Sequence, residues 1–226
     1  MRRILPVLLL AAACGGDPPP VATAPVPSHT YACGGEPVAL TGLDGPPTTR
    51  LGPNGQAALK GGEVRAPADL EAWRIVEETD DRVALIRELD TPVQHGSILQ
   101  THQYLLIERY GRDDAWNLRM SGRCDLRQVV PGHGEAALAF ASATGTRLNL
   151  WVTEKDCASG RPATGRIKLA ALEETDQEVR VVVAVRPVDG SVTCQGNPRT
   201  PFTVELSRPL GDRTVVDAAV HPPRRL

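Results

Sequence analysis

Five cysteines carry the most reactive side chains in this sequence of 226 residues, and they stand at positions 14, 33, 124, 157 and 194. A cysteine thiol forms a disulfide, binds zinc or takes part in redox exchange, and each role favours its own spacing. The last four cysteines are separated by 91, 33 and 37 residues, with no Cys-x-x-Cys pair among them. Neither a zinc site nor a dithiol redox centre fits these spacings, so we expect two disulfides.

Four cysteines allow three pairings. We favour Cys33–Cys124 together with Cys157–Cys194. The second pair joins two turn-rich segments, CASGRPATG and TCQGNP, which flank an expected pair of strands. Closing that loop stabilises a folded chain by roughly 3–4 kcal/mol in the chain-entropy model.

Cys14 follows a short apolar segment that is typical of an export signal. Two arginines precede ten apolar residues, Ile4–Ala13. As a helix, ten residues cover about 15 Å, half of the ~30 Å hydrocarbon core of a bilayer, so this segment is too short to span a membrane. We therefore expect a signal peptide over residues 1–13.

The run Ala-Ala-Ala-Cys that ends at Cys14 resembles the bacterial lipobox, in which small residues precede a lipidated cysteine. Ala11 stands where the lipobox prefers leucine. The resemblance implies cleavage before Cys14 and acyl chains on its thiol, which would hold the protein on a membrane. Lipidation of Cys14 also leaves an even number of cysteines for disulfides. The alternative is an ordinary secretory signal that is cleaved after Ala13.

Residues 14–30 are expected to form a Pro-rich tether behind the lipid. The run GGDPPPVATAPVPSHT favours an extended, semi-stiff chain over a helix or a strand. No later segment is long and apolar enough to span a bilayer, so the lipid is the expected membrane contact. We predict an extracytoplasmic, lipid-anchored bacterial protein, in a compartment where disulfides persist.

The histidines and serines match no metal-binding or catalytic motif. His95 and His102, seven residues apart, are interpreted as solvated loop residues rather than metal ligands. Ser159 has no Gly-x-Ser-x-Gly context and indicates a Ser-Gly turn beside the solvated Arg161 and Arg166.

The acidic residues also have a simple interpretation. Glu77, Glu78, Asp80 and Asp81 fit a hairpin tip whose charges are solvated. We therefore predict no catalytic residue, no metal and no cofactor. A formal net charge of −2 without a basic run argues against nucleic acid as a partner.

One loop could present a rigid surface to a partner. The run Asn-Pro-Arg-Thr-Pro at residues 197–201 is stiff, and stiffness lowers the ordering cost of binding. With the segment across the second disulfide, it defines a candidate partner surface of Arg161, Arg166, Asn197 and Arg199. The alternative is a loop that only joins two strands.

Apolar periodicity predicts an all-β fold with little helix, in two small packed subdomains over residues 31–130 and 135–226. In the first we expect an antiparallel meander of about four strands, near residues 73–75, 83–85, 104–110 and 116–120, with a surface loop at 34–66 and one helical turn at 67–72. In the second, sandwich-like subdomain we expect strands near residues 138–140, 147–152, 181–185, 202–207 and 215–216, followed by a polar tail. Within the strand at 147–152, Leu148, Leu150 and Val152 alternate with Arg147, Asn149 and Trp151.

Two C-terminal segments, CASGRPATGRI and VRPVDGSVTCQGNPRTPFTVELSRPLGDRTVVD, resemble a group of uncharacterised secreted or lipid-anchored actinobacterial proteins. The likeness covers roughly residues 145–220 and, more loosely, 73–130. It implies export and supports the Cys157–Cys194 pairing, but it implies no activity. We predict a non-enzymatic module that binds a protein or cell-wall partner. The alternative is an extracytoplasmic hydrolase whose site is assembled from distant loops.

Overall fold

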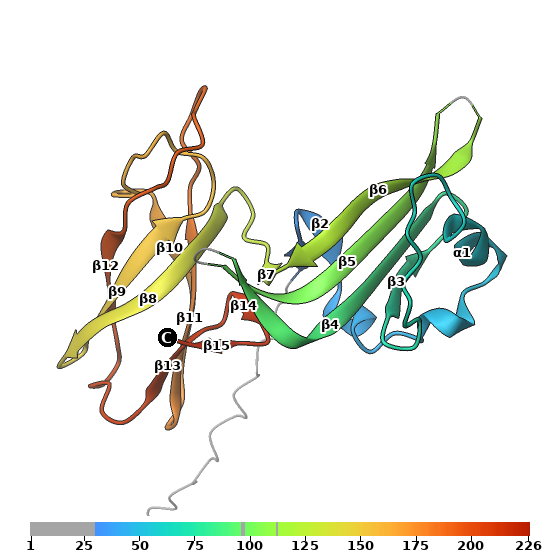
Figure 1. Cartoon of the computed structure of the whole chain (residues 1–226). Helices are drawn as coiled ribbons and strands as arrows, with labels where there is room; N and C mark the ends of the chain where they lie inside the picture. The colour runs from blue at the N-terminus through green and yellow to red at the C-terminus, as the bar shows by residue number, and fades with distance from the viewer. Residues whose placement is uncertain (1–29, 96–97, 112) are drawn as a thin grey trace, which may run out of the picture.

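The computed structural model describes residues 30–95, 98–111 and 113–226, which fold almost entirely into β-strands (Figure 1). The predicted all-β fold is confirmed. Within these described ranges no helix combines the length and the apolarity that crossing a bilayer requires. The expected signal peptide, the lipid-bearing Cys14 and the tether through residue 29 lie outside the described residues.

The first lobe, at the right of Figure 1, is an antiparallel meander with a small sheet and the first short helix against one face and the helix over residues 53–58 against the other. The meander has four strands in sequential order: β3 (Arg74–Glu78), β4 (Arg82–His95), β5 (Ile98–Tyr110) and β6 (Ala115–Cys124). The small sheet has the order β14 (Val220–His221), β7 (Leu126–Gln128), β1 (Tyr31–Cys33) and β2 (Glu36–Val38). The helices are η1 (Leu40–Gly42), η2 (Thr48–Arg50) and α1 (Pro53–Ala58).

The meander is buried on both faces at its centre. All four residues of Val83–Ile86 in β4 and all four of Tyr104–Ile107 in β5 are buried. Alternate residues pack into two different clusters, one against the small sheet and one against α1. An uninterrupted apolar run is the signature of a strand covered on both sides.

Helix α1 was not expected, because contacts from distant residues fix it. The backbone N–H groups of Gly52 and Gly55 donate to the Glu78 carboxylate at 3.1 and 2.7 Å. A side chain at Gly55 would approach Leu51 Cδ2 to 2.3 Å, so glycine is needed there. The interpretation of Glu78 as a solvated charge at a hairpin tip is therefore wrong. The helical turn expected at 67–72 is replaced by a turn over residues 70–73, which the Trp73 N–H closes by donating to the carbonyl of Leu70 at 3.4 Å.

The second lobe, at the left of Figure 1, is a sandwich made by one sheet that bends at β8. One layer has the order β12 (Thr200–Glu205), β9 (Arg147–Glu154) and β8 (Gly134–Thr144). The other layer has β10 (Ile167–Glu174), β11 (Glu178–Val185), β13 (Thr214–Asp217) and β15 (Arg224–Arg225). Alternate residues of β9, Leu148, Leu150 and Val152, point into a core shared with valines of β11. All pairs are antiparallel except β11 with β13.

Residues 220–226, which we call the clasp, join the two lobes. Strand β14 pairs with β7 of the first lobe, and β15 pairs with β13 of the second. Leu226 packs against the sandwich core. The prediction of a polar tail is therefore wrong, because these residues contribute a strand to each lobe.

Both expected disulfides are present, with the favoured pairing. Cys33–Cys124 connects β1 to the end of β6, and Cys157–Cys194 connects two loops of the second lobe. Disulfides persist in oxidising compartments outside the cytoplasm, which indicates an extracytoplasmic protein.

Candidate functional site

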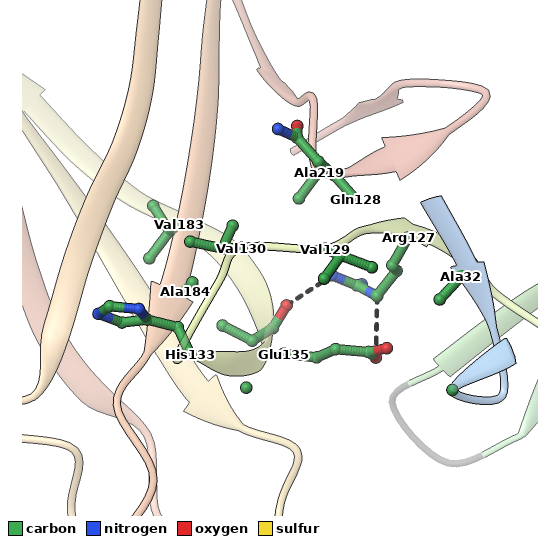
Figure 2. Close-up of a pocket in the computed structure, with 13 residues that line it drawn as sticks. Ala32, Arg127, Gln128, Val129, Val130, His133, Glu135, Val183, Ala184 and Ala219 are labelled. Atoms are coloured by element: carbon green, nitrogen blue, oxygen red, sulfur yellow. Dashed lines mark hydrogen bonds and ion pairs between the residues drawn. The ribbon is translucent and has the colours of Figure 1, made fainter. Parts of the chain in front are cut away.

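A cavity of about 200 Å³ lies where the lobes meet (Figure 2). Its walls come from β1, from the segment that joins β7 to β8, and from β11. Val129, Val130 and Val183 make much of the wall apolar, while Arg127 and Glu135 bring charge into it. Apolar walls with a few polar groups are common in ligand sites, so the chemistry of these charges decides what the cavity can do.

Arg127 is the central charge of the junction and is only 3% exposed. Its Nε donates to Asp125 at 2.8 Å, and its Nη1 donates to the carbonyl of Ala136 at 2.8 Å. The carboxylates of Glu135 and Asp217 lie 3.6 and 3.8 Å from its nitrogens. Asp125 and Arg127 flank Leu126, so the two-residue period of a strand places both on one side.

Two further cations complete this cluster. Lys155 donates to the Glu135 carboxylate, and Arg224 of the clasp lies 3.1 Å from Asp125. A buried charge is tolerated when it is paired and hydrogen-bonded, and three cations here face three carboxylates. The cluster is thus balanced internally: Arg127, Lys155 and Arg224 against Asp125, Glu135 and Asp217.

Burial raises the pKa of Asp217 above its ordinary value, although the nearby Arg127 opposes this. A carboxyl with a raised pKa can act as a general acid where it faces space that a substrate can enter. Asp217 does not suit that role, because it is 2% exposed and accepts the backbone N–H of Ala219 at 3.0 Å. We therefore assign the cluster to holding the lobes together.

Asp156 is the other carboxyl with a raised pKa, through burial first and then through the charges of Glu135 and Glu154. Its carboxylate lies where a side chain at position 134 would stand, 1.6 Å from an ideal Cβ on Gly134. It lines an open hollow of about 380 Å³ beside the Cys157–Cys194 disulfide. Among the described residues that line this hollow, Thr153 carries the one hydroxyl, and the Lys155 ammonium is bound to the Glu135 carboxylate.

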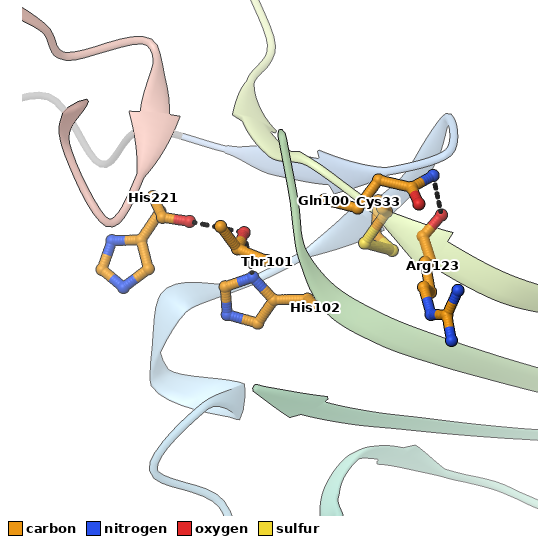
Figure 3. The surroundings of a disulfide bond; sticks show 7 residues. Cys33, Gln100, Thr101, His102, Arg123 and His221 are labelled. Atoms are coloured by element: carbon orange, nitrogen blue, oxygen red, sulfur yellow. Dashed lines mark hydrogen bonds between the residues drawn. A yellow bond between two sulfur atoms is a disulfide. The ribbon is translucent and has the colours of Figure 1, made fainter. Parts of the chain in front are cut away.

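The interpretation of His102 as a solvated loop residue is wrong, because it lies on β5 and is 2% exposed. Thr101 stands between two histidines (Figure 3): its Oγ1 lies 2.9 Å from His102 Nδ1 and donates to the carbonyl of His221 at 3.5 Å. The two imidazole centroids are 6.3 Å apart. Burial lowers the pKa of His102; the charge of Glu88 opposes this, and the nearby His221 adds to it. His95 is exposed, at the end of β4.

Among the residues that the structure describes, no group of three or more His, Cys, Asp and Glu side chains has the arrangement of a metal site.

The four residues of the expected partner surface divide into two pairs. Arg166 is not solvated, because both its terminal nitrogens bind the Glu154 carboxylate, at 2.7 and 2.5 Å. The Asn197 amide donates to the carbonyls of Glu154 and Asp156, at 3.0 and 2.7 Å, and so pins its loop. Arg161 and Arg199 are exposed.

The expected Ser-Gly turn at Ser159 and Gly160 is present, with φ angles of 54° and 66°. Ser159 Oγ accepts the backbone N–H of Thr193 at 2.9 Å, which ties the two disulfide-linked loops to each other. The hydroxyl is thus engaged in holding a turn.

Sequence reasoning assigned no role to Trp151, whose side chain is the most conspicuous on the outer sandwich face. Its alternation with Leu150 and Val152 places it on the outward side of β9, and the residue is 38% exposed. In the register of the sheet its direct neighbours are Ala139 on β8 and Pro201 on β12. The sequence held a signal for this exposed aromatic, because Trp151 occupies an outward position of β9 that is otherwise polar.

Comparison with known proteins leaves the assignment to these observations: no protein-family model, curated protein or solved structure matches the chain.

Proposed function

We propose that this protein is a lipid-anchored, extracytoplasmic binding module of the cell envelope without catalytic activity of its own. The anchor is the lipidated Cys14, and the described body is the part that meets a partner. The partner is a component of the envelope, either a protein or a wall polymer.

One observation carries the preference for binding over hydrolysis. Arg127 at the junction cavity is paired with carboxylates, among them Asp217. Asp217, whose pKa is raised, is buried. A hydrolase needs a base and a nucleophile or activated water that reach a shared open space. The outer sandwich face and the exposed Arg161 and Arg199 remain available to a partner instead.

The anchor is tested by fractionating a lipoprotein-processing host that expresses the full chain or its Cys14→Ala variant. We expect the parent protein with the membranes and the variant in the soluble fraction, because two or three acyl chains give stable anchoring. Mass spectrometry of the amino terminus should show a lipidated cysteine. An unmodified, uncleaved terminus in the parent protein would remove the anchor from the proposal.

The binding role is tested with the soluble Cys14→Ala protein. We expect it to sediment with isolated envelope fragments and to saturate as its concentration rises. A reduced and alkylated sample is the control, because it keeps the composition but loses the disulfide-braced fold. Sedimentation that is absent, or equal for both samples, would contradict a binding module.

A further inference from the structure

We propose that the outer face of the β8–β9–β12 layer, centred on Trp151, binds a carboxylate-bearing saccharide chain. This inference rests on the proposed binding function and names its surface and its ligand class. The occupant is a chain of sugar rings in which at least one ring carries a carboxylate.

The face is built as a row with one aromatic at its centre. Across the three strands, Ala139, Trp151 and Pro201 stand side by side. The flanking residues are small or rigid, and Trp151 keeps 38% of its surface exposed. The apolar C–H face of a pyranose ring stacks on such an aromatic surface, whose π face is electron-rich.

Polar groups border this row on both sides. The next row toward one end holds Ala137 and Thr153, with Arg199 preceding β12. The row toward the other end holds Asn149 and Thr203, whose side chains are hydrogen-bonded at 2.8 Å. Hydroxyl and amide groups beside an aromatic match a ligand that has one apolar ring face and a rim of hydroxyls.

The face also has a hollow with a charge at its edge. A depression of about 230 Å³ lies beside Trp151 and is lined by Ala137, Ala139, Thr153 and Arg199. In the described part of the chain the Arg199 side chain has no ion pair or hydrogen bond. A guanidinium offers a fork of donors that fits a carboxylate, which gives the expected ligand its charge.

The loop that carries the exposed Arg161 comes near one strand of this layer. It is tied to the start of β12, because the Ala163 N–H donates to Thr200 Oγ1 at 2.8 Å. Two acidic residues of the same layer are both paired: Glu135 at the start of β8 with Lys155, and Glu205 at the far end of β12 with Arg147 at 3.1 Å. The free charge of the face is therefore cationic.

A protein partner fits this face less well. A stable protein interface buries about 800 Å² on each side, with several aromatic or aliphatic anchors at its centre. Here a single large side chain is surrounded by alanine, threonine and asparagine. This composition favours a ligand that stacks one ring at a time.

The experiment uses the soluble Cys14→Ala protein with two matched probes, tetragalacturonate and its methyl ester, which have the same rings with and without charge. Trp73 and Trp116 are 4% and 7% exposed, so acrylamide quenching of tryptophan fluorescence reports mainly on Trp151. We expect the acid to protect Trp151 from quenching in a saturable way. The affinity for the ester should be lower by a factor of about ten or more, because the ester cannot form the charge-assisted hydrogen bonds.

Variants separate the ring from the charge. Trp151→Ala should abolish binding of both probes in calorimetry, and Arg199→Gln should reduce binding of the acid to the level of the ester. Tyr110→Ser removes an exposed aromatic of the first lobe and should change nothing. Arg199→Gln and Tyr110→Ser should keep the melting temperature of the parent, because these side chains are exposed. Trp151→Ala removes an indole that is 38% exposed and should lower the melting temperature, so its native fold is checked by circular dichroism at the temperature of the binding measurement.

Unchanged binding in Trp151→Ala, or equal affinity for both probes, would overturn the assignment of this surface. If either outcome is found while the parent protein still sediments saturably with envelope fragments, the saccharide proposal fails and the proposed binding function stands. If neither probes nor envelope fragments bind, both fail.

Discussion

The two lobes bury their cores in different ways. In the first lobe a single meander is covered on both faces, so the centres of β4 and β5 are apolar without interruption. In the second lobe two layers face each other, and β9 alternates between buried and exposed residues. The first arrangement covers both faces of its sheet, whereas the second leaves the outer residues of β9 partly exposed.

The difference extends to the disulfides. Cys33–Cys124 lies in the core of the first lobe, with both residues buried. Cys157–Cys194 joins two loops, and Cys194 is exposed. The first bond holds a sheet against its cover, and the second holds loops at the border of a surface. The following predictions test this contrast.

The largest effect is expected from replacing the buried disulfide. The double variant Cys33→Ala/Cys124→Ala should lose roughly 4–5 kcal/mol of unfolding free energy, because the bond closes a loop with a sequence separation of 91. Urea unfolding followed by circular dichroism measures it. If this variant loses less unfolding free energy than the one that lacks Cys157–Cys194, the contrast between the two disulfides is wrong.

Removing the central charge of the junction should follow closely. Arg127→Met leaves Asp125 and Asp217 buried without their main cation, and breaking a buried pair costs about 3–5 kcal/mol. The matched control is Arg147→Met, which breaks the exposed pair with Glu205 and should cost within about 0.5 kcal/mol. Equal costs for the two variants would show that the junction cluster contributes nothing special.

The exposed disulfide should matter less to the whole molecule. Cys157→Ala/Cys194→Ala should cost roughly 3–4 kcal/mol for a separation of 37. Amide hydrogen exchange should place the added opening in the loops around Ser159 and Thr193 and leave the first lobe unchanged. Faster exchange in β4 and β5 instead would contradict the separate roles.

The smallest effect concerns pH and the first lobe. Burial lowers the pKa of His102 below the value of about 6.5 expected in an unfolded chain. The folded state therefore favours neutral His102. The stability that this gives is present above the pKa of the unfolded chain and is lost as the pH falls from there through the lower pKa of the folded state. Melting temperatures between pH 8 and pH 5 should fall less in His102→Gln than in the parent. Asp217, whose pKa is raised, acts in the opposite direction, but it does so in both proteins. Parallel curves of melting temperature against pH would therefore count against a role of His102.

Sequence periodicity predicted the elements whose apolar pattern is local. The hairpin of β3 and β4, the end of β5 at Tyr110 and the alternation of β9 were expected and are present. Both disulfides were also expected, and loops rich in glycine and proline identified the second.

The elements that were missed depend on distant partners. Helix α1 is capped by Glu78, which lies more than twenty residues away in the sequence. Strand β10 has a bulge between Leu169 and Ala171, which disturbs the period that would identify it. The clasp contains prolines and arginines and forms strands only because β7 and β13 offer edges to it.

The candidate site was less accessible to sequence reasoning than the fold. Arg161 and Arg199 were expected at a surface and are exposed, but Arg166 and Asn197 turn inward because Glu154 and nearby carbonyls bind them. The pairing of Arg127 with three carboxylates brings together residues from three segments. A pattern along one strand cannot reveal such a meeting.

The position of Cys33 has a mechanical consequence. The carbonyl of Thr30 accepts the Val129 N–H at 2.7 Å, and β1 then pairs with β7. A pulling force applied through the preceding chain can peel away only residues 30–32 before it meets the covalent link from Cys33 to Cys124. The load then passes to the end of β6 and is shared along the hydrogen bonds between β6 and β5. A force on the chain before Thr30 is thus carried to the edge strand of the meander, whose centre is covered on both faces.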